Sequence, residues 1–121
     1  MGGYGAILLA EKYPQIFRAA AAVSPAIWTS YAQARAVNSG AYASAAAFAR
    51  ADAVTHAGAL GDVSVRVASG ISDPFHPGVR ALASRLPDGA VVDISKGCHT
   101  GPFFLSQVPP SLAFLARHLG S

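Results

Sequence analysis

The sequence predicts an α/β protein, with about three parallel strands and helices that flank the sheet. Segments with the pattern of buried or half-buried strands alternate along the chain with segments of helical periodicity. Every predicted strand runs directly into a loop of turn-forming residues. The length of 121 residues suits one compact domain and is too short for two.

The first predicted element is a helix over residues 5–13, which carries apolar side chains on most of its faces. A helix that is apolar all round is typically buried. Pro14 ends this helix, because proline cannot continue the helical hydrogen-bond pattern. Just before the helix, Gly2 and Gly3 predict a tight backbone turn or a close approach between backbones.

A short buried strand is predicted over residues 18–23, where the apolar run RAAAAV stops at the loop SPAIW. The region that follows, residues 29–60, is rich in alanine and is interrupted by the turn-forming sequence Asn38-Ser39-Gly40. We expect two or more short helices in this region.

Two more strands are predicted over residues 63–68 (VSVRVA) and 90–94 (AVVDI), because both are rich in β-branched residues. Between them, residues 77–86 predict a helix that begins at Pro77, since proline fits the first turn of a helix. The loop SGISDPF follows the first of these strands and the loop SKGCHTGP follows the second. This alternation is typical of a parallel sheet with helices on its faces.

A final amphipathic helix is predicted from Pro110. Leu112, Leu115 and Leu119 recur in it at helical spacing and form its expected apolar face. The predicted order of elements is therefore helix, strand, two or more helices, strand, helix, strand and helix.

The composition is poor in charge and rich in alanine. Charged residues make up 12% of the chain, against roughly 25% in an average soluble domain. About a fifth of the residues are alanine. Two interpretations stay open: the chain buries more surface than its own size explains, or it comes from a GC-rich genome that favours Ala, Gly, Arg and Pro.

Nine basic residues give the chain a formal net charge of +3. They are spread almost evenly along the sequence, whereas a nucleic-acid-binding surface needs clustered basic residues. We therefore expect all nine at solvated positions and predict no nucleic-acid partner.

Cys98 is the single cysteine, which excludes an internal disulfide and a cysteine-based metal site. The first residues lack the basic segment and apolar core of a signal peptide. No apolar run reaches the roughly 20 residues that a membrane-spanning helix needs. The compartment stays open, with the cytoplasm as the default and secretion of a longer parent protein as the alternative.

Two residues capable of acid–base chemistry follow neighbouring predicted strands: Asp73, and then His99. Because ligand sites in parallel sheets lie beyond the carboxyl ends of the strands, we expect the two side chains to meet there. A carboxylate that orients a histidine, which then acts as general base, is two-thirds of a nucleophilic triad. The order Asp before His, with the nucleophile upstream of both, is typical of α/β hydrolases.

Three other histidines compete with His99 for the role of base. His76 is the strongest rival, because it also lies beyond the end of a predicted strand, three residues after Asp73. Residues so close together on one loop seldom face each other well, which favours His99. His56 and His118 fall in predicted helices and are expected at the surface.

The sequence contains no nucleophile at the position that this order of residues predicts. In α/β hydrolases it lies on a Gly-x-Ser-x-Gly turn between a strand and a helix. Met1 and Gly2 match the last two letters of that motif, so the serine would stand one position before Met1. Ser24 is rejected as a substitute because no glycines flank it, and Cys98, next to His99, is interpreted as a small packing residue.

The chain opens with MGGYGAILLAEKYPQIFRAAAAVSPAIW, which resembles the segment right after the nucleophile in the putative-esterase family of α/β hydrolases. That family includes the S-formylglutathione hydrolase (esterase D) and mycolyltransferase branches. Later come VRVASGISDPFHPGVRALASRLP, similar to the family's acid-bearing strand and loop, and KGCHTGPFFLSQVPPSLAFLARHL, similar to its histidine loop and closing helix. The likeness covers nearly the whole chain and is weakest over residues 29–60.

This resemblance implies that residues 1–121 are the C-terminal part of an α/β-hydrolase domain, beginning just after the nucleophilic serine. The parts would be a nucleophile-elbow helix, a lid-like region over residues 29–60, an acid loop, a histidine loop and a closing helix. Asp73 and His99 would be catalytic, and the backbone N–H of Met1 would be one oxyanion donor. The substrate would be a small carboxylic ester, and neither a cofactor nor a metal is implied.

The resemblance also implies the surroundings of the catalytic residues. Gly2 and Gly3 would belong to the elbow turn, and the expected pocket wall is aromatic, formed by Tyr4, Trp28 and Phe75.

Three hypotheses follow from these observations. In the first, the chain is the C-terminal portion of a serine esterase and is inactive alone, because it lacks the nucleophile. In the second, it is a non-catalytic truncated domain that self-associates through an exposed sheet edge. In the third, it is an unrelated small α/β binding domain, in which Asp73 and His99 are incidental.

Overall fold

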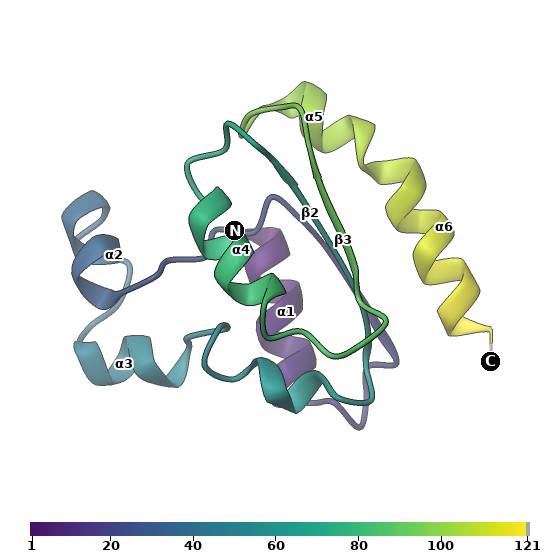
Figure 1. Cartoon of the computed structure of the whole chain (residues 1–121). Coiled ribbons are helices and arrows are strands. Elements are labelled where there is room, and N and C mark those ends of the chain that lie inside the picture. The colour runs from purple at the N-terminus through teal and green to yellow at the C-terminus, as the bar shows by residue number, and fades with distance from the viewer. Residues whose placement is uncertain (121) are drawn as a thin grey trace.

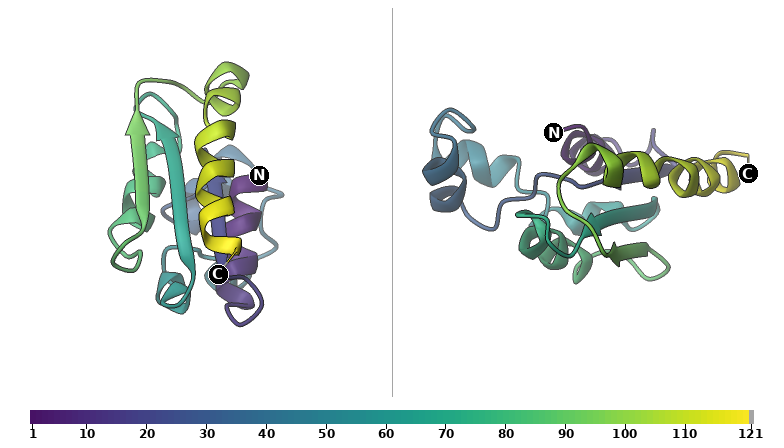
Figure 2. Two further views of the ribbon diagram at one scale, coloured as in Figure 1. Left: turned by 90° about the vertical axis from the view of Figure 1, so that its right-hand side faces the viewer. Right: turned by 90° about the horizontal axis from the view of Figure 1, so that it is seen from above.

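The computed structural model describes residues 1–120 and shows a three-stranded parallel sheet between two layers of helices (Figures 1 and 2). This arrangement confirms the predicted α/β class and the three predicted strands. The elements in chain order are α1 (Gly2–Lys12), β1 (Ala19–Val23), α2 (Tyr31–Val37), α3 (Ala45–Arg50), the 3-10 helix η1 (Ala57–Leu60), β2 (Ser64–Gly70), α4 (His76–Ala83), β3 (Val91–Ser95), α5 (Gly101–Ser106) and α6 (Val108–Leu119).

The strands lie in the order β1-β2-β3, and both pairs are parallel. In register, Ala20 of β1 lies opposite Val65 of β2, and Val67 of β2 lies opposite Val92 of β3. β2 is the central strand and is almost completely buried. The carboxyl ends of all three strands therefore meet at one edge of the sheet, where sites of parallel sheets form.

One face of the sheet carries the main hydrophobic core. Side chains alternate between the two faces of a strand, so Val65 and Val67 of β2 point to the same face. There they pack with residues of α1, η1 and α4. The largest fully buried members of this core are Ile7, Leu60, Val65, Val67, Val79 and Leu82. α6 covers the opposite face and contacts β1 and β2 (Figure 2).

Glycine lets α1 and α4 approach the neighbouring backbone closely. Gly2 and Gly3 form the first turn of α1, which begins three residues earlier than expected, rather than a turn before it. A Cβ atom at Gly3 would lie 2.8 Å from the carbonyl oxygen of Val23, so the close approach expected here is present at Gly3. A side chain at Gly78 of α4 would likewise collide with the backbone of Ile27.

The alanine-rich region forms the short helices α2, α3 and η1. Ser30 caps α2 by accepting a hydrogen bond from the backbone N–H of Gln33 (3.1 Å), and Ser44 caps α3 in the same way through Ala47 (3.1 Å). α2 and α3 project to one side of the sheet and its covering helices (Figure 1).

The C-terminal part differs from the prediction in two respects. α5 begins at Gly101, inside the segment predicted as the loop SKGCHTGP, because Pro102 fits the first turn of a helix. α6 begins at Val108, and its expected apolar face is wrong: Leu112 and Leu119 are 61% and 62% exposed. The buried residues of α6 are Ser111 and Phe114.

Two further expectations fail. Arg66 was expected at a solvated position, but it is 3% exposed, because α6 covers the face of β2 to which it points. Cys98 was expected to be a packing residue, but it is exposed.

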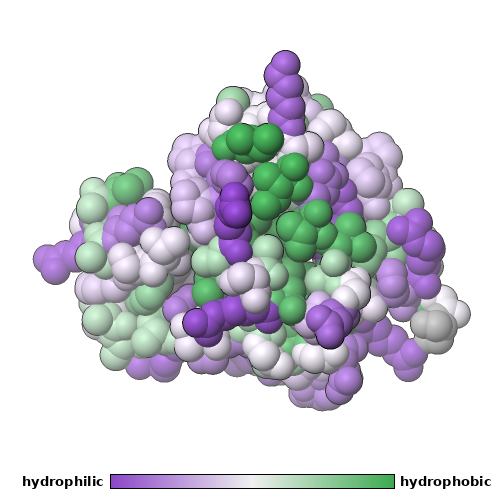
Figure 3. All heavy atoms as spheres, viewed as in Figure 1, coloured by the Kyte–Doolittle hydropathy of each residue, from purple (hydrophilic) through white to green (hydrophobic). Residues whose placement is uncertain are grey.

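Large apolar side chains lie at the surface near both edges of the sheet. Val91 and Val92 of β3 are 41% and 40% exposed, and hydrophobic side chains gather along β3 in Figure 3. Within residues 1–120, β1, at the other edge, pairs only with β2. Ile16 and Phe17, which lead into β1, are also exposed. Among residues 1–120, no helix has both the length and the apolar character to span a membrane.

Candidate active site

The loop after β2 holds Asp73 in a buried position. The Asp73 side chain is 0% exposed, and its Oδ1 accepts a hydrogen bond from the backbone N–H of Phe75 (2.8 Å). This contact two residues along the chain is the Asx turn that an Asp-Pro sequence favours. The Asp73 carbonyl accepts the N–H of His76 (2.9 Å), where α4 begins. The carboxylate is therefore fixed by its own loop.

The loop after β3 lies directly against the end of β2. The carbonyl of Gly97 accepts a hydrogen bond from the N–H of Ser72 (2.9 Å). A Cβ atom at Gly70 would collide with the backbone of Gly97, so the two loops can meet only because Gly70 has no side chain. Gly97 in turn leaves room for the ring of Phe103 in α5.

These two loops bring Asp73 and His99 together. Nδ1 of His99 lies 2.8 Å from Oδ2 of Asp73, across 26 positions of sequence. A carboxylate accepts hydrogen bonds and donates none, so Nδ1 carries the proton of this contact, and in the neutral imidazole Nε2 then has the lone pair. The His99 side chain is 34% exposed, whereas the carboxylate is enclosed. This arrangement can orient an imidazole whose Nε2 serves as a base.

Aromatic rings surround the imidazole of His99. The ring centroids of Phe75 and Phe104 lie 5.4 and 4.9 Å from that of His99. Trp28 packs edge-on against Phe75 at 4.8 Å. Phe75 and Phe104 come from two different segments and both contact the imidazole, while Trp28 supports the ring of Phe75.

The other candidate side chains do not join this pair. His56 and His118 direct Nδ1 to the backbone carbonyls of Asp52 and Phe114. Nε2 of His76 is buried and has no hydrogen-bond partner. Ser24 is buried, and its hydroxyl also lacks a partner. Its φ of 46° lies in the left-handed region that non-glycine residues rarely adopt.

Comparison with known families gives a match over most of the chain. The model of the family described as "Putative esterase" matches residues 1–85. The chain belongs to the putative-esterase family. The matched residues include Asp73 and end before His99. The sequence comparison with curated proteins gives no significant match.

The esterase fold is also seen among solved structures. The crystal structure of the S-formylglutathione hydrolase from Staphylococcus aureus, as apoenzyme, is similar with a TM-score of 0.59 and 14% sequence identity. The similarity covers 95% of the present chain and 47% of that chain, so this esterase-family chain spans about half the length of the hydrolase. At this identity the likeness shows the fold alone.

The predicted pocket residues of this esterase-family chain line one small cavity. Met1, Tyr4, Trp28 and Phe75 share a cavity of about 140 Å³. Four further residues line it, all from the loop after β1 and the alanine-rich region: Ala26, Asn38, Ala41 and Tyr42. Of these, Asn38, Ala41 and Tyr42 were missed as pocket residues, because nothing in an alanine-rich stretch distinguishes a wall residue from a surface residue.

Tyr4 connects the cavity to the alanine-rich region. Its hydroxyl donates a hydrogen bond to the carbonyl of Ala51 and accepts one from the hydroxyl of Tyr42 (2.9 Å). Burial, followed by this contact with Tyr42, raises the pKa of Tyr4 far above its usual value. Tyr4 therefore stays a neutral hydrogen-bonding group that connects α1 to the residue that follows α3.

Glu11 is a buried acid away from this cavity, on α1. It is 7% exposed, and neither carboxyl oxygen has a hydrogen-bond partner. Burial, and secondarily the charge of Asp52, raises the pKa of Glu11 to about 8. Among residues 1–120, no three His, Cys, Asp or Glu side chains cluster so that they could hold a metal ion.

Proposed function

We propose that this chain is the C-terminal portion of a serine hydrolase that acts on carboxylic esters, and that it carries the base and the orienting acid. The observation that carries the proposal is the 2.8 Å contact between His99 Nδ1 and the buried Asp73 carboxylate. Membership of the putative-esterase family supports the same reaction class.

In the proposed mechanism, a serine hydroxyl attacks the ester carbonyl while Nε2 of His99 takes the hydroxyl proton. Asp73 holds the imidazole in the required tautomer and stabilises its positive charge. The imidazolium then gives the proton to the leaving alcohol oxygen. Water attacks the acyl-enzyme with His99 again as base, which releases the acid and restores the serine.

The nucleophile is the part that residues 1–121 do not supply. No serine of the sequence lies in a Gly-x-Ser-x-Gly motif. In a longer chain, a serine directly before Met1 would complete that motif with Gly2. The peptide N–H of Met1 would then be one oxyanion donor. We therefore propose that the 121-residue chain alone is inactive as an esterase.

The remaining parts receive roles by their positions. α1 is the elbow helix, and Gly2 and Gly3 form its first turn. Residues 29–60 form the lid-like region, and Asn38, Ala41 and Tyr42, between α2 and α3, line the cavity. Tyr4, Trp28 and Phe75 are the aromatic wall of the substrate pocket.

The codons that precede Met1 in the source DNA test the nucleophile directly. We expect Gly-x-Ser in the same reading frame; a stop codon or unrelated residues would overturn the proposal of a longer parent. The protein extended by those residues should hydrolyse p-nitrophenyl butyrate and react with a fluorophosphonate probe. His99→Ala in the extended protein should lower kcat by about 10⁴-fold or more, whereas His76→Ala should retain activity as the matched control.

A second candidate role is self-association through the free edge of β1. In the part of the chain that the structure describes, this strand pairs only with β2, and exposed N–H and C=O groups on a strand edge are a template for another strand. Ile16 and Phe17 are exposed where the chain enters β1. We propose that, without further strands beside β1, the chain associates with itself there.

A further inference from the structure

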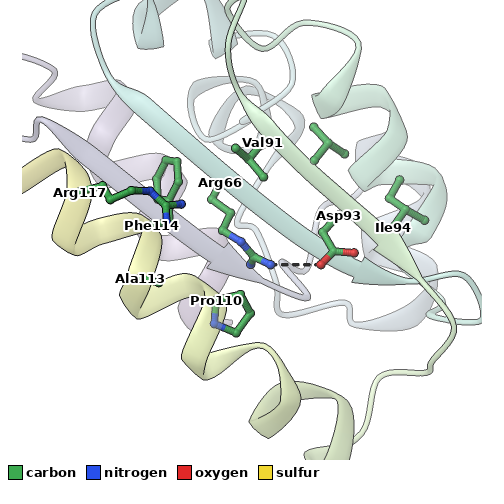
Figure 4. A pocket seen from close by; sticks show the side chains of 9 residues that line it. Arg66, Val91, Asp93, Ile94, Pro110, Ala113, Phe114 and Arg117 are labelled. Carbon is green, nitrogen blue, oxygen red and sulfur yellow. Dashed lines mark hydrogen bonds and ion pairs between the residues drawn. The ribbon is translucent and has the colours of Figure 1, made fainter.

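Arg66 is a buried cation between the sheet and α6. Its side chain is 4% exposed, although it lies in the middle of the central strand (Figure 4). Its neighbours Val65 and Val67 point into the core formed with α1, η1 and α4. By alternation along the strand, Arg66 points to the other face, which α6 covers.

The guanidinium of Arg66 hydrogen-bonds to three acceptors on three different segments. Nη1 donates to Oγ of Ser111 in α6 (3.0 Å). Nη2 donates to Oδ2 of Asp93 in β3 (3.1 Å) and to Oε1 of Gln107 (2.8 Å), between α5 and α6. The planar, multiply donating guanidinium suits such a junction, whereas a lysine ammonium does not match its geometry.

The segments that Arg66 connects are those that carry the candidate active site. β2 leads from Arg66 into the Asp73 loop. Asp93 lies on β3, which precedes the loop that holds His99. Gln107 and Ser111 come after that loop and after α5. Both sides of the histidine loop are therefore attached to one group on the strand that carries the acid.

α6 buries few large apolar side chains against the sheet. Phe114 is the one large apolar side chain that α6 buries, while Leu112 and Leu119 are exposed. Beside the guanidinium, a groove of about 570 Å³ opens between β3 and α6, and Asp93 is partly exposed in it (Figure 4). Burying a guanidinium costs desolvation that an apolar side chain would avoid. The polar junction thus sets where α5 and α6 begin relative to β2.

We propose that Arg66 is a positioning residue for the Asp73–His99 pair. Its guanidinium fixes β3 and the α5–α6 junction relative to β2, at the separation where His99 Nδ1 meets the Asp73 carboxylate. That the pair serves catalysis rests on the proposed function. The test below measures the geometry of the pair and not ester hydrolysis.

The test is a long-range ¹H–¹⁵N spectrum of the imidazole rings in the ¹⁵N-labelled 121-residue chain. In the unaltered chain, His99 should show the tautomer with the proton on Nδ1. In Arg66→Met, which keeps an apolar stem, we expect this single tautomer to be lost to a mixture of the two. Arg66→Lys should also lose the single tautomer. If Arg66→Met does not fold, the result for Arg66→Lys tests the proposal. His56, whose Nδ1 contacts the carbonyl of Asp52 and which is not a partner of Arg66, should be unchanged in every variant.

Leu82→Ala is the matched control, because Leu82 is fully buried on the opposite face of the sheet. It loosens the core without touching the guanidinium junction, so His99 should keep its Nδ1–H tautomer. Retention of that tautomer in Arg66→Lys, or equal loss in Leu82→Ala, would overturn the proposal. So would its absence from the unaltered chain. Lack of esterase activity in the extended protein would count against the proposed function and leave this result intact.

Discussion

The buried carboxylate of Asp73 holds Nδ1 of His99 at 2.8 Å, so that two loops beyond neighbouring parallel strands form one hydrogen-bonded pair. Asp73 is anchored independently by the N–H of Phe75, on its second carboxyl oxygen. One oxygen therefore positions the acid and the other orients the imidazole. The following predictions depend on this division and on the packing around it.

Asp73→Asn should leave the fold intact and remove the orientation of the base. An amide can donate a hydrogen bond to Nδ1, which places the imidazole proton on Nε2, the wrong nitrogen for a base. In the extended protein, we expect kcat for p-nitrophenyl butyrate to fall by about 10⁴-fold. Asp88→Asn, at an exposed turn, is the control and should keep full activity. A loss of less than tenfold in Asp73→Asn would contradict the assigned role.

Glu11 should make the protein less stable as the pH rises. Its pKa is about 8 in the folded chain, against 4.5 as the ordinary value. Between these values the unfolded chain releases a proton that the folded chain keeps, so the free energy of unfolding falls with pH across this window. The stabilisation is complete below about pH 4.5 and lost above about pH 8. Urea unfolding at a series of pH values measures this slope.

Glu11→Gln should flatten that pH dependence, because the amide does not titrate. Glu11→Met should also raise the free energy of unfolding at pH 8 by about 1–3 kcal/mol, since it removes a buried group without a hydrogen-bond partner. Asp88→Asn, at an exposed position, should keep the slope of the unaltered chain. An unchanged slope in Glu11→Gln would show that another group causes the pH dependence.

Gly70→Ala should disturb the Asp73–His99 pair through the backbone. The added methyl group would collide with the backbone of Gly97, in the loop that carries His99. We expect a loss of about 1–3 kcal/mol in the free energy of unfolding, together with loss of the His99 Nδ1–H tautomer. Gly58→Ala is the matched control, because nothing lies within 4 Å of a Cβ there. It should be neutral or stabilising by up to about 1 kcal/mol. Equal effects of both variants would rule out the proposed collision.

Ala21→Pro should reduce self-association of the 121-residue chain. The N–H of Ser24 bonds to Ala68 of β2, and backbone groups alternate in direction along a strand. The N–H of Ala22 thus points to β2 and that of Ala21 to the free edge. Proline at position 21 removes an edge donor and leaves the ladder to β2 intact.

Analytical ultracentrifugation measures this effect over a range of concentrations. Ala21→Pro should shift the chain toward the monomer with little change in its circular dichroism. Ala22→Pro, one residue along, breaks the β1–β2 ladder instead and should destabilise the fold. If Ala21→Pro associates as strongly as the unaltered chain, the edge of β1 is not the interface.

The sheet and the acid–base pair were predictable because their signals are local. RAAAAV, VSVRVA and AVVDI each have the apolar or β-branched pattern of a strand, and each runs into a loop with turn residues. Parallel pairing then places the loops that contain Asp73 and His99 at the same edge of the sheet. The topology alone was enough to bring the two side chains together.

The errors come from tertiary contacts that a local pattern does not contain. In VSVRVA, an arginine between valines normally marks a solvated face, but α6 covers that face and supplies Ser111 and Gln107 as partners. The same contacts turn Ser111 inward and leave Leu112 at the surface. α5 was missed because the sequence Gly101-Pro102 is equally compatible with a loop and with the first turn of a helix.

Trp28 is the single tryptophan of the chain, and it stacks edge-on against Phe75, the ring next to His99. Its indole thus forms part of the wall of the small cavity. The tryptophan fluorescence of the protein, excited apart from the four tyrosines, consequently originates at the candidate site. A small molecule that binds in this cavity should change the tryptophan emission spectrum, so binding can be followed without a dye or chemical label.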